Sequence, residues 1–260
     1  MNLDDLSVFH QLDTQNMMDS INELPDQLMA AWVTGLALPI PADLRDLRQV
    51  VIAGMGGSAI GADLLAAYAA ESCLLPLVVH RNYDLPAWIQ GPETLFIASS
   101  HSGNTEETLS AFEQARSRGC RRMALTTGGR LAELGQEDGS FTWRFAHSGQ
   151  PRAAVGYTFG MLLAVLYRLG LIPDPHQDLK ETLEAMRSQQ ADLLPEVQAA
   201  NNPAKRMAGQ LVGRWVAVFA ADDFLPVARR WKGQISEIAK AWGQFESLPE
   251  ADHNSLAGLN

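Results

Sequence analysis

Three hydroxyl side chains lie close together in one polar turn, between an apolar run and a helical pattern. The turn reads Ser100-His101-Ser102-Gly103-Asn104-Thr105, and the apolar run before it covers residues 94–98. The first N–H groups of a helix have no internal partner, and the helix dipole is positive at that end, so the turn favours an anion. A simple helix cap is the alternative, but a cap needs one hydroxyl rather than three. We expect Ser100, Ser102 and Thr105 to hold a phosphate monoester, most simply that of a sugar phosphate.

A glycine-rich turn, Gly54-Met55-Gly56-Gly57-Ser58, follows an earlier apolar run at residues 50–53. We expect Gly56, Gly57 and Ser58 to let the backbone approach the sugar closely, because glycine has no side chain in the way. The spacing Gly54-x-Gly56-x-x-Ala59 also fits an NAD(P)-binding turn. That site needs an acid about 20 residues on, at the end of the next strand. The next strand ends His80-Arg81-Asn82, with no acid before Asp84, so an NAD(P)-binding domain is the less favoured alternative.

The composition narrows the class of protein. A net charge of −10 and a pI near 5.0 argue against a nucleic-acid surface, although a cleft can still bind an anion locally. The two cysteines, Cys73 and Cys120, form neither a disulfide framework nor a metal-ligand pattern, so we expect reduced thiols and no metal. There is no signal-peptide pattern and no apolar run of the roughly 18 residues that a membrane span needs. We therefore expect a cytoplasmic protein that binds no membrane.

Strand-like and helix-like segments alternate through the first two thirds of the chain. This order predicts an α/β fold, a three-layer αβα sandwich with a parallel sheet of the flavodoxin-like kind. One helix is well marked at residues 106–118, since acids occupy its first turn, arginines its last turn, and Gly119 follows. The expected strands are residues 50–53, 77–80, 95–99, 123–126 and 141–145, and the other helices of this part include 59–70 and 157–169.

A second sheet begins near the end of the sequence. Residues 214–219 read as a strand, residues 225–242 as the following helix, and residues 245–260 have room for one more strand. So short a sheet exposes an edge and an apolar face, so we expect a partner to cover it or the chain to be the front part of a longer protein. The predicted organisation is a helical segment at 1–45, a first domain at 46–172, a helical linker at 173–204 and an incomplete second domain at 205–260.

Four segments occur in an order that resembles a known family. They are Gly54-Met55-Gly56-Gly57-Ser58, Ser100-His101-Ser102-Gly103-Asn104-Thr105, Pro151-Arg152-Ala153, and Arg230-Trp231-Lys232-Gly233-Gln234-Ile235-Ser236-Glu237 with Leu248-Pro249-Glu250 and His253-Asn254. Together they resemble the bifunctional phosphoglucose/phosphomannose isomerases, which are built from two sugar-isomerase (SIS) domains. The resemblance covers about residues 50–259. Members of the family usually continue for several tens of residues, in a tail with a lysine linked to ring opening and a threonine linked to mannose 6-phosphate.

The resemblance implies an aldose–ketose isomerase that interconverts glucose 6-phosphate, and also mannose 6-phosphate, with fructose 6-phosphate through a cis-enediol. Glu237 would be the base between C1 and C2, although a solvated pair with Lys240 is the plainer reading of its position. His253 would move protons at the ring oxygen and O1 in the neighbouring subunit of a homodimer with shared active sites. Arg152 would steady the enediol oxygen, although a surface arginine is its plainer reading.

These roles need no metal or organic cofactor, because a carboxylate base and fixed hydrogen-bond donors suffice for an enediol path. The alternative function is non-catalytic. SIS domains also serve as sugar-phosphate sensors, and a truncated, inactive isomerase would bind the ligand in the same way.

Overall fold

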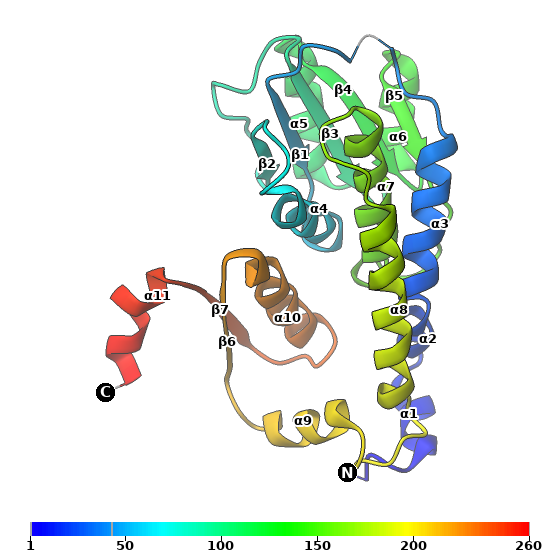
Figure 1. Cartoon of the computed structure of the whole chain (residues 1–260), viewed down its shortest axis with the longest axis vertical. Coiled ribbons are helices and arrows are strands. Elements are labelled where there is room, and N and C mark those ends of the chain that lie inside the picture. The colour runs from blue at the N-terminus through cyan, green and yellow to red at the C-terminus, as the bar shows by residue number, and fades with distance from the viewer. Residues whose placement is uncertain (1, 43, 260) are drawn as a thin grey trace. The chain divides into compact units, whose positions relative to one another are not determined.

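Five parallel strands form the central sheet of the computed structural model, which describes residues 2–42 and 44–259 (Figure 1). The strand order is β2-β1-β3-β4-β5, and every neighbouring pair is parallel. The strands are β1 (Gln49–Ala53), β2 (Leu77–His80), β3 (Thr94–Ser100), β4 (Arg121–Thr126) and β5 (Phe141–Arg144). Each expected strand is therefore present, and the predicted α/β class with a parallel sheet is confirmed.

Helices cover both faces of this sheet, because the central strands are apolar on both sides. Val51 and Phe96 point into a core shared with α5 and α6, and the alternate residues of β1 and β3 point to the opposite face. Helices α4 and α7 pack against each other there (Figure 1). The bounds of these helices are α4 (Gly56–Ala69), α5 (Glu106–Ser117), α6 (Gly129–Glu137) and α7 (Val155–Arg168).

The chain divides into two compact units. One is Asp26–Pro173, which contains the five-stranded sheet and most of α3 (Leu24–Ala37). In this unit α3 approaches α7 closely, since a Cβ at Gly160 would lie 2.8 Å from that of Ala31. The other unit combines Met1–Pro25 with Asp174–Asn260. The four-part division expected from the sequence stays a prediction.

The second unit is built mostly of helices. Its helices are α1 (Leu6–Leu12), α2 (Met17–Asn22), α8 (His176–Leu193), α9 (Pro203–Leu211), α10 (Leu225–Glu237) and α11 (Glu250–His253). Hydrogen bonds tie the N-terminal segment to the C-terminal one, since the ammonium of Lys205 lies 3.1 Å from the Asp4 carboxylate. The amide of Gln190 also donates to the carbonyl oxygen of Asn22 at 2.8 Å.

Two parallel strands, β6 (Val216–Ala221) and β7 (Gly243–Leu248), form the sheet of this unit in the described part of the chain, with α10 against both. The helix expected at 225–242 is shorter than predicted: it ends at Glu237, and Lys240 has a left-handed φ of 54°.

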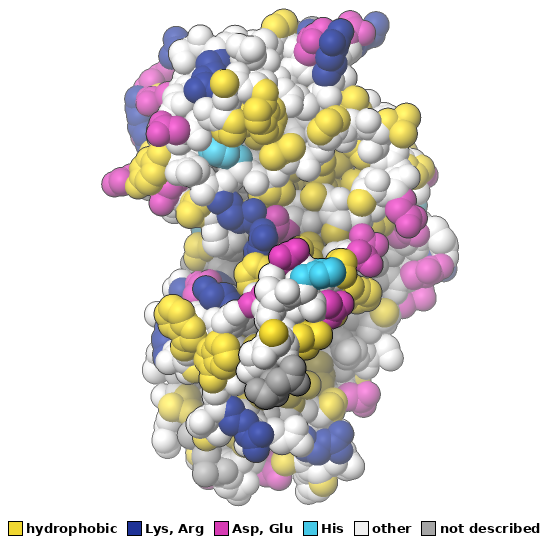
Figure 2. All heavy atoms as spheres, turned by 90° about the vertical axis from the view of Figure 1, so that its left-hand side faces the viewer, with side chains coloured by type: hydrophobic (Ala, Val, Ile, Leu, Met, Phe, Trp, Pro, Cys, Tyr) yellow, Lys and Arg dark blue, Asp and Glu magenta, His cyan; other side chains and the backbone are white. Residues whose placement is uncertain are grey.

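Hydrophobic side chains gather in patches among charged ones on the face drawn in Figure 2. The large exposed apolar residues of segment 212–242 are Val212, Trp215, Phe219, Phe224, Val227, Trp231, Ile238 and Trp242.

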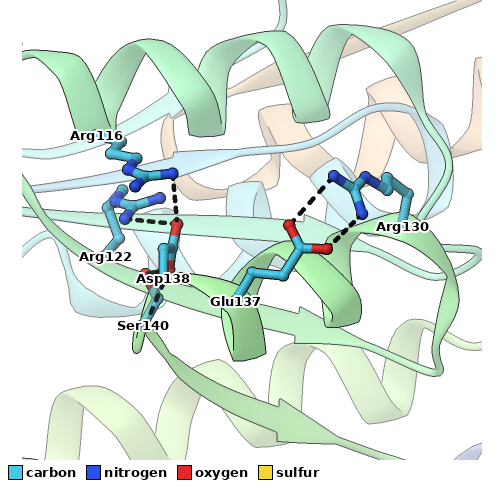
Figure 3. Close-up of polar contacts among 6 residues, drawn as sticks. All are labelled: Arg116, Arg122, Arg130, Glu137, Asp138 and Ser140. Atoms are coloured by element: carbon cyan, nitrogen blue, oxygen red, sulfur yellow. Dashed lines mark hydrogen bonds and ion pairs between the residues drawn. The ribbon is translucent and has the colours of Figure 1, made fainter.

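A buried ion pair lies at the amino end of β4 (Figure 3). A nitrogen of the Arg122 guanidinium lies 2.8 Å from an oxygen of Asp138, and both side chains are more than nine-tenths buried. The other Asp138 oxygen accepts from the hydroxyl of Ser140 at 2.6 Å. Burial raises the pKa of the Asp138 carboxyl, but hydrogen bonds from Ser140 and Arg122 outweigh it, so the pKa lies below its ordinary value. The charge of Asp138 is therefore part of the folded core.

Candidate functional site

Parallel strands end at one edge of a sheet, so the turns after β1, β3, β4 and β5 meet there. In open α/β sheets this carboxyl edge is where ligands bind. The turns in question are residues 54–58, 101–105, 127–128 and 145–153, and each lies in the Asp26–Pro173 unit. The structure thus brings together the sequence segments that carry the predicted phosphate and sugar contacts.

The turn after β3 is held by its own hydroxyls. Ser100, the last residue of β3, is almost fully buried, and its oxygen lies 3.0 Å from the hydroxyl of Thr105. The same oxygen accepts from the N–H of Gly103 at 3.1 Å. Ser102 is exposed, and its hydroxyl accepts from the N–H of Asn104 at 3.2 Å. The three predicted phosphate residues therefore surround one turn at the start of α5.

Thr105 occupies the N-cap position of α5 without capping it through its side chain. A cap would place the hydroxyl oxygen on an N–H of the first helical turn. Here that hydroxyl pairs with Ser100 instead. The start of α5 therefore has no side-chain cap from Thr105, and phosphate binding by the three hydroxyls stays a prediction.

Thr108 is a further hydroxyl at this helix start, and the sequence analysis did not single it out. It lies in the first turn of α5, is about 1% exposed, and its oxygen has no hydrogen-bond partner in the described part of the chain. Buried hydroxyls are usually paired, so this one is unusual. Its spacing of three residues from Thr105 places both on one side of the helix, which was the available signal.

Close backbone contacts explain the glycines of the turn after β1. A Cβ at Gly57 would lie 2.4 Å from the carbonyl oxygen of Pro151, so only glycine fits there. Gly56 has a left-handed φ of 48° and is exposed. Ser58, at 7% exposure, accepts a hydrogen bond from the N–H of His101 at 3.0 Å. These contacts join the turn after β1 to the turn after β3 and to the segment that carries Arg152.

Arg152 lies in a short 3₁₀ helix, η1 (Pro151–Ala153), and is half-buried. Its backbone nitrogen is 3.1 Å from where a Cβ at Gly57 would stand. The backbone of Arg152 therefore lies at the same edge of the sheet as the glycine and serine turns. Seven predicted residues meet at this edge, namely Gly56, Gly57, Ser58, Ser100, Ser102, Thr105 and Arg152.

Glu237 and His253 lie in the other compact unit. Glu237 is the last residue of α10 and is half-buried. The ammonium of Lys240 donates to its backbone carbonyl at 2.6 Å, so the contact between these two residues caps the helix end. Arg230 lies two turns earlier on the same face of α10. Burial lowers the pKa of Arg230, and the negative charge of Glu237 opposes that shift. His253 ends α11 and is exposed.

One ion pair bears on the NAD(P)-binding alternative. The guanidinium of Arg81, just after β2, forms an ion pair with Asp63 of α4, at the place where an NAD(P) site needs a free acid.

Within residues 2–42 and 44–259, no three His, Cys, Asp or Glu side chains gather closely enough to hold a metal ion. In the same ranges, no helix has the length and apolar character to cross a membrane.

Comparisons with known proteins identify the relatives of this chain. Residues 200–260 match the family model described as the bacterial phospho-glucose isomerase C-terminal SIS domain. The chain is 39% identical over 243 residues to the bifunctional phosphoglucose/phosphomannose isomerase of Caldicellulosiruptor bescii, covering 93% of this chain and 71% of that protein. It is 33% identical over 220 residues to the enzyme of the same name from Aquifex aeolicus, covering 84% of this chain and 64% of that one.

A solved structure agrees on the fold. The C-terminal domain of glucosamine-fructose-6-phosphate aminotransferase from Francisella tularensis superposes with a TM-score of 0.69 at 14% identity, over 94% of this chain and 73% of that one. The fold matches although most residues differ. The identity to the Caldicellulosiruptor bescii enzyme, over most of both chains, decides the family. The chain belongs to the bifunctional phosphoglucose/phosphomannose isomerase family.

Proposed function

We propose that this protein interconverts glucose 6-phosphate, and also mannose 6-phosphate, with fructose 6-phosphate. The turn between β3 and α5 carries the proposal. It presents the hydroxyls of Ser100, Ser102 and Thr105 at the start of a 12-residue helix whose first residue is Glu106. Hydroxyls and helix N–H groups bind a phosphate monoester without a metal. Family membership supports a sugar phosphate as the ligand.

The reaction follows from the chemistry of the bound sugar. A base takes the proton from C2 of the open aldose while O1 gains a proton, which gives a cis-enediol. The base then returns its proton to C1 while O2 loses one, which gives the ketose. We assign the base to Glu237, the proton movements at the oxygens to His253, and the stabilisation of the enediol oxygen to Arg152.

The subunits of a homodimer would share these roles, with His253 of one chain beside Glu237 of the other. Gly56, Gly57 and Ser58 would bring the backbone close to the sugar. The exposed position of His253 on α11 supports this arrangement, because a side chain that acts in a neighbouring subunit must be reachable from outside its own. The chain spans 71% of the Caldicellulosiruptor bescii enzyme and 64% of the Aquifex aeolicus enzyme, so the isomerase activity of the whole enzyme is a proposal for this chain.

Incubation of the protein with fructose 6-phosphate in D₂O tests the proposal. We expect glucose 6-phosphate with deuterium at C2, observed by NMR, because the base exchanges its proton with solvent during turnover. Calorimetry on the same sample measures binding separately. Binding without deuterium incorporation would indicate a sugar-phosphate sensor rather than an isomerase. Absence of binding would contradict the proposal and favour the NAD(P)-binding alternative.

A further inference from the structure

Two imidazole rings share a hydrogen bond beside the turn that follows β3. Nε2 of His101 lies 2.8 Å from Nδ1 of His147, and the ring centroids are 5.1 Å apart at 84°. In a neutral pair one nitrogen donates and the other accepts. The second ring comes from the segment after β5, 46 residues further along the chain. The fold therefore builds a pair that no sequence pattern joins.

Aromatic rings enclose this pair. Phe145 contacts His101 edge-on at 5.9 Å and stacks on Tyr157 of α7 at 5.2 Å. Tyr157 in turn lies 5.5 Å from His147. Burial lowers the pKa of His101, and the neighbouring His147 lowers it further. The pair is thus surrounded by groups that favour its neutral form when no ligand is bound.

The backbone of His101 belongs to the candidate phosphate turn. Its N–H donates to the Ser58 hydroxyl at 3.0 Å, and its carbonyl accepts from the hydroxyl of Thr127 at 2.7 Å. Consecutive Cα atoms are only about 3.8 Å apart, so His101 sits directly between Ser100 and Ser102. A charge on its ring lies within about one Debye length of a phosphate held by those serines.

The charged and titratable groups around the pair come from several elements. Arg144 at the end of β5 donates to the carbonyl of Thr127 at 3.1 Å, and Arg152 follows in η1. Tyr157 comes from α7, and the start of α4 contributes the uncharged Ser58. The first turn of α5 carries Glu106 and Glu107, and that of α6 carries Arg130. Burial and the neighbouring ring oppose a proton on His101, whereas a bound phosphate dianion attracts one.

We propose that the His101–His147 pair takes up one proton when a sugar phosphate binds, and so adds a positive charge to the phosphate site. The proton comes from solvent and binds the outer nitrogen of the ring that donates, because the nitrogen that faces the partner ring already holds the shared proton. The donor ring then becomes an imidazolium that still donates to the neutral ring. This inference rests on the proposed function. It makes His101 a positioning residue whose effect on affinity depends on pH.

Calorimetry of fructose 6-phosphate binding, in buffers of different ionisation enthalpy, counts the protons taken up. The ligand's own phosphate also titrates near pH 6, so the count is compared with that of His101→Phe, which keeps a ring against Phe145. We expect the wild type to take up roughly half a proton more than this variant near pH 6.5. His147→Phe should give the same difference from the other side of the hydrogen bond, and His10→Gln, on the exposed face of α1, should give none.

Affinity gives a second measurement. A one-unit rise in pKa that adds about half a proton on binding strengthens binding by about threefold at the same pH. We therefore expect His101→Phe to lose about threefold in affinity near pH 6.5 and nothing near pH 9, where both forms lack the proton. Equal proton counts in the wild type and both variants would overturn the inference, as would a loss of affinity that is the same at both pH values. If the wild type binds no fructose 6-phosphate, the proposed function fails as well. Binding of fructose 6-phosphate with equal proton counts in the wild type and the variants would contradict only the inference about the His101–His147 pair.

Discussion

The hydroxyl oxygens of Ser100 and Thr105 lie 3.0 Å apart across the turn between β3 and α5. This hydrogen bond closes the turn from its two ends, and the N–H of Gly103 adds a third contact to Ser100. A Cβ at Gly103 would lie 1.8 Å from the carbonyl oxygen of Gly128, so the turn also presses directly against the one after β4. The hydroxyls are held in place before any ligand arrives, which reduces the entropy that binding must remove.

Removal of two hydroxyls from this turn should weaken ligand binding. For Ser102→Ala combined with Thr105→Ala we expect the affinity for fructose 6-phosphate to fall by roughly 2–3 kcal/mol, about two hydrogen bonds to a charged group. Calorimetry measures the change. Ser117→Ala, at the exposed end of the same helix, is the matched control and should bind normally. Unchanged affinity in the double variant would place the phosphate elsewhere.

Glu237→Gln tests the assignment of the base. Glutamine keeps the shape but accepts no proton, so we expect binding to persist while isomerisation falls by a factor of about 10² or more. Glu246→Gln on β7 serves as the control carboxylate in the same unit. Deuterium exchange at C2, measured by NMR, follows the step itself. Exchange at the wild-type rate in Glu237→Gln would remove this residue from the chemistry.

If the active sites are shared between the subunits of a homodimer, a mixture of two inactive variants should regain activity. Glu237→Gln and His253→Ala chains, each inactive alone, are unfolded together and allowed to reassociate. Random pairing makes half of the dimers mixed, each with one intact site, so about a quarter of the sites should recover activity. Activity assays and light scattering check the result. An inactive mixture of correctly dimeric chains would mean that His253 acts in its own subunit or has no role.

The two carboxylates of Figure 3 should differ in their contribution to stability. Asp138→Asn leaves the buried Arg122 guanidinium without its charged partner, so we expect a loss of roughly 3 kcal/mol in the free energy of unfolding at neutral pH. Glu137→Gln, at the neighbouring position, removes an exposed pair with Arg130 and should change it by less than about 1 kcal/mol. Urea unfolding measures both.

The same pair of variants tests the pH dependence. The pKa of the folded Asp138 is lowered, so its contribution is fully present above its unfolded pKa of about 3.9 and is lost as the pH falls through the folded value. The difference between the wild type and Asp138→Asn should therefore shrink below about pH 4. A difference that stayed constant down to pH 2 would assign it to packing rather than to charge.

Much of the fold could be predicted because its strands are short apolar runs between clear turns. The helix at α5 was also predictable: acids begin it, and Gly119, with a φ of 71°, follows it. The end of α10 was not, because the chain leaves the helix after Glu237 and turns through the left-handed Lys240 before Gly243 pairs with Val216, and that pairing is a contact of the fold. Within the helical linker expected at 173–204, α8 likewise ends at Leu193, since Leu194 precedes a proline.

The candidate site was predictable wherever its residues are neighbours in the sequence. The turns with Gly57 and Ser102 were recognised because each contains its own motif. His147 was missed, because its partner lies 46 residues away and only the fold brings the rings together. Thr108 was missed because its signal in the sequence is only the three-residue spacing from Thr105, whereas its unpaired buried oxygen is seen in the fold alone.

The strand order of the main sheet has a consequence for the nascent chain on the ribosome. The first residue of β1, Gln49, lies opposite Thr94 at the start of β3, 45 residues later. At synthesis rates of about 5–20 residues per second, β1 waits roughly 2–9 seconds for this neighbour. During that time an apolar segment that is almost fully buried in the fold, residues 50–53, has at most β2 beside it. Such a segment is a natural binding site for chaperones that recognise extended apolar chain, and we expect slower synthesis at low temperature to raise the yield of folded protein only when such chaperones are present.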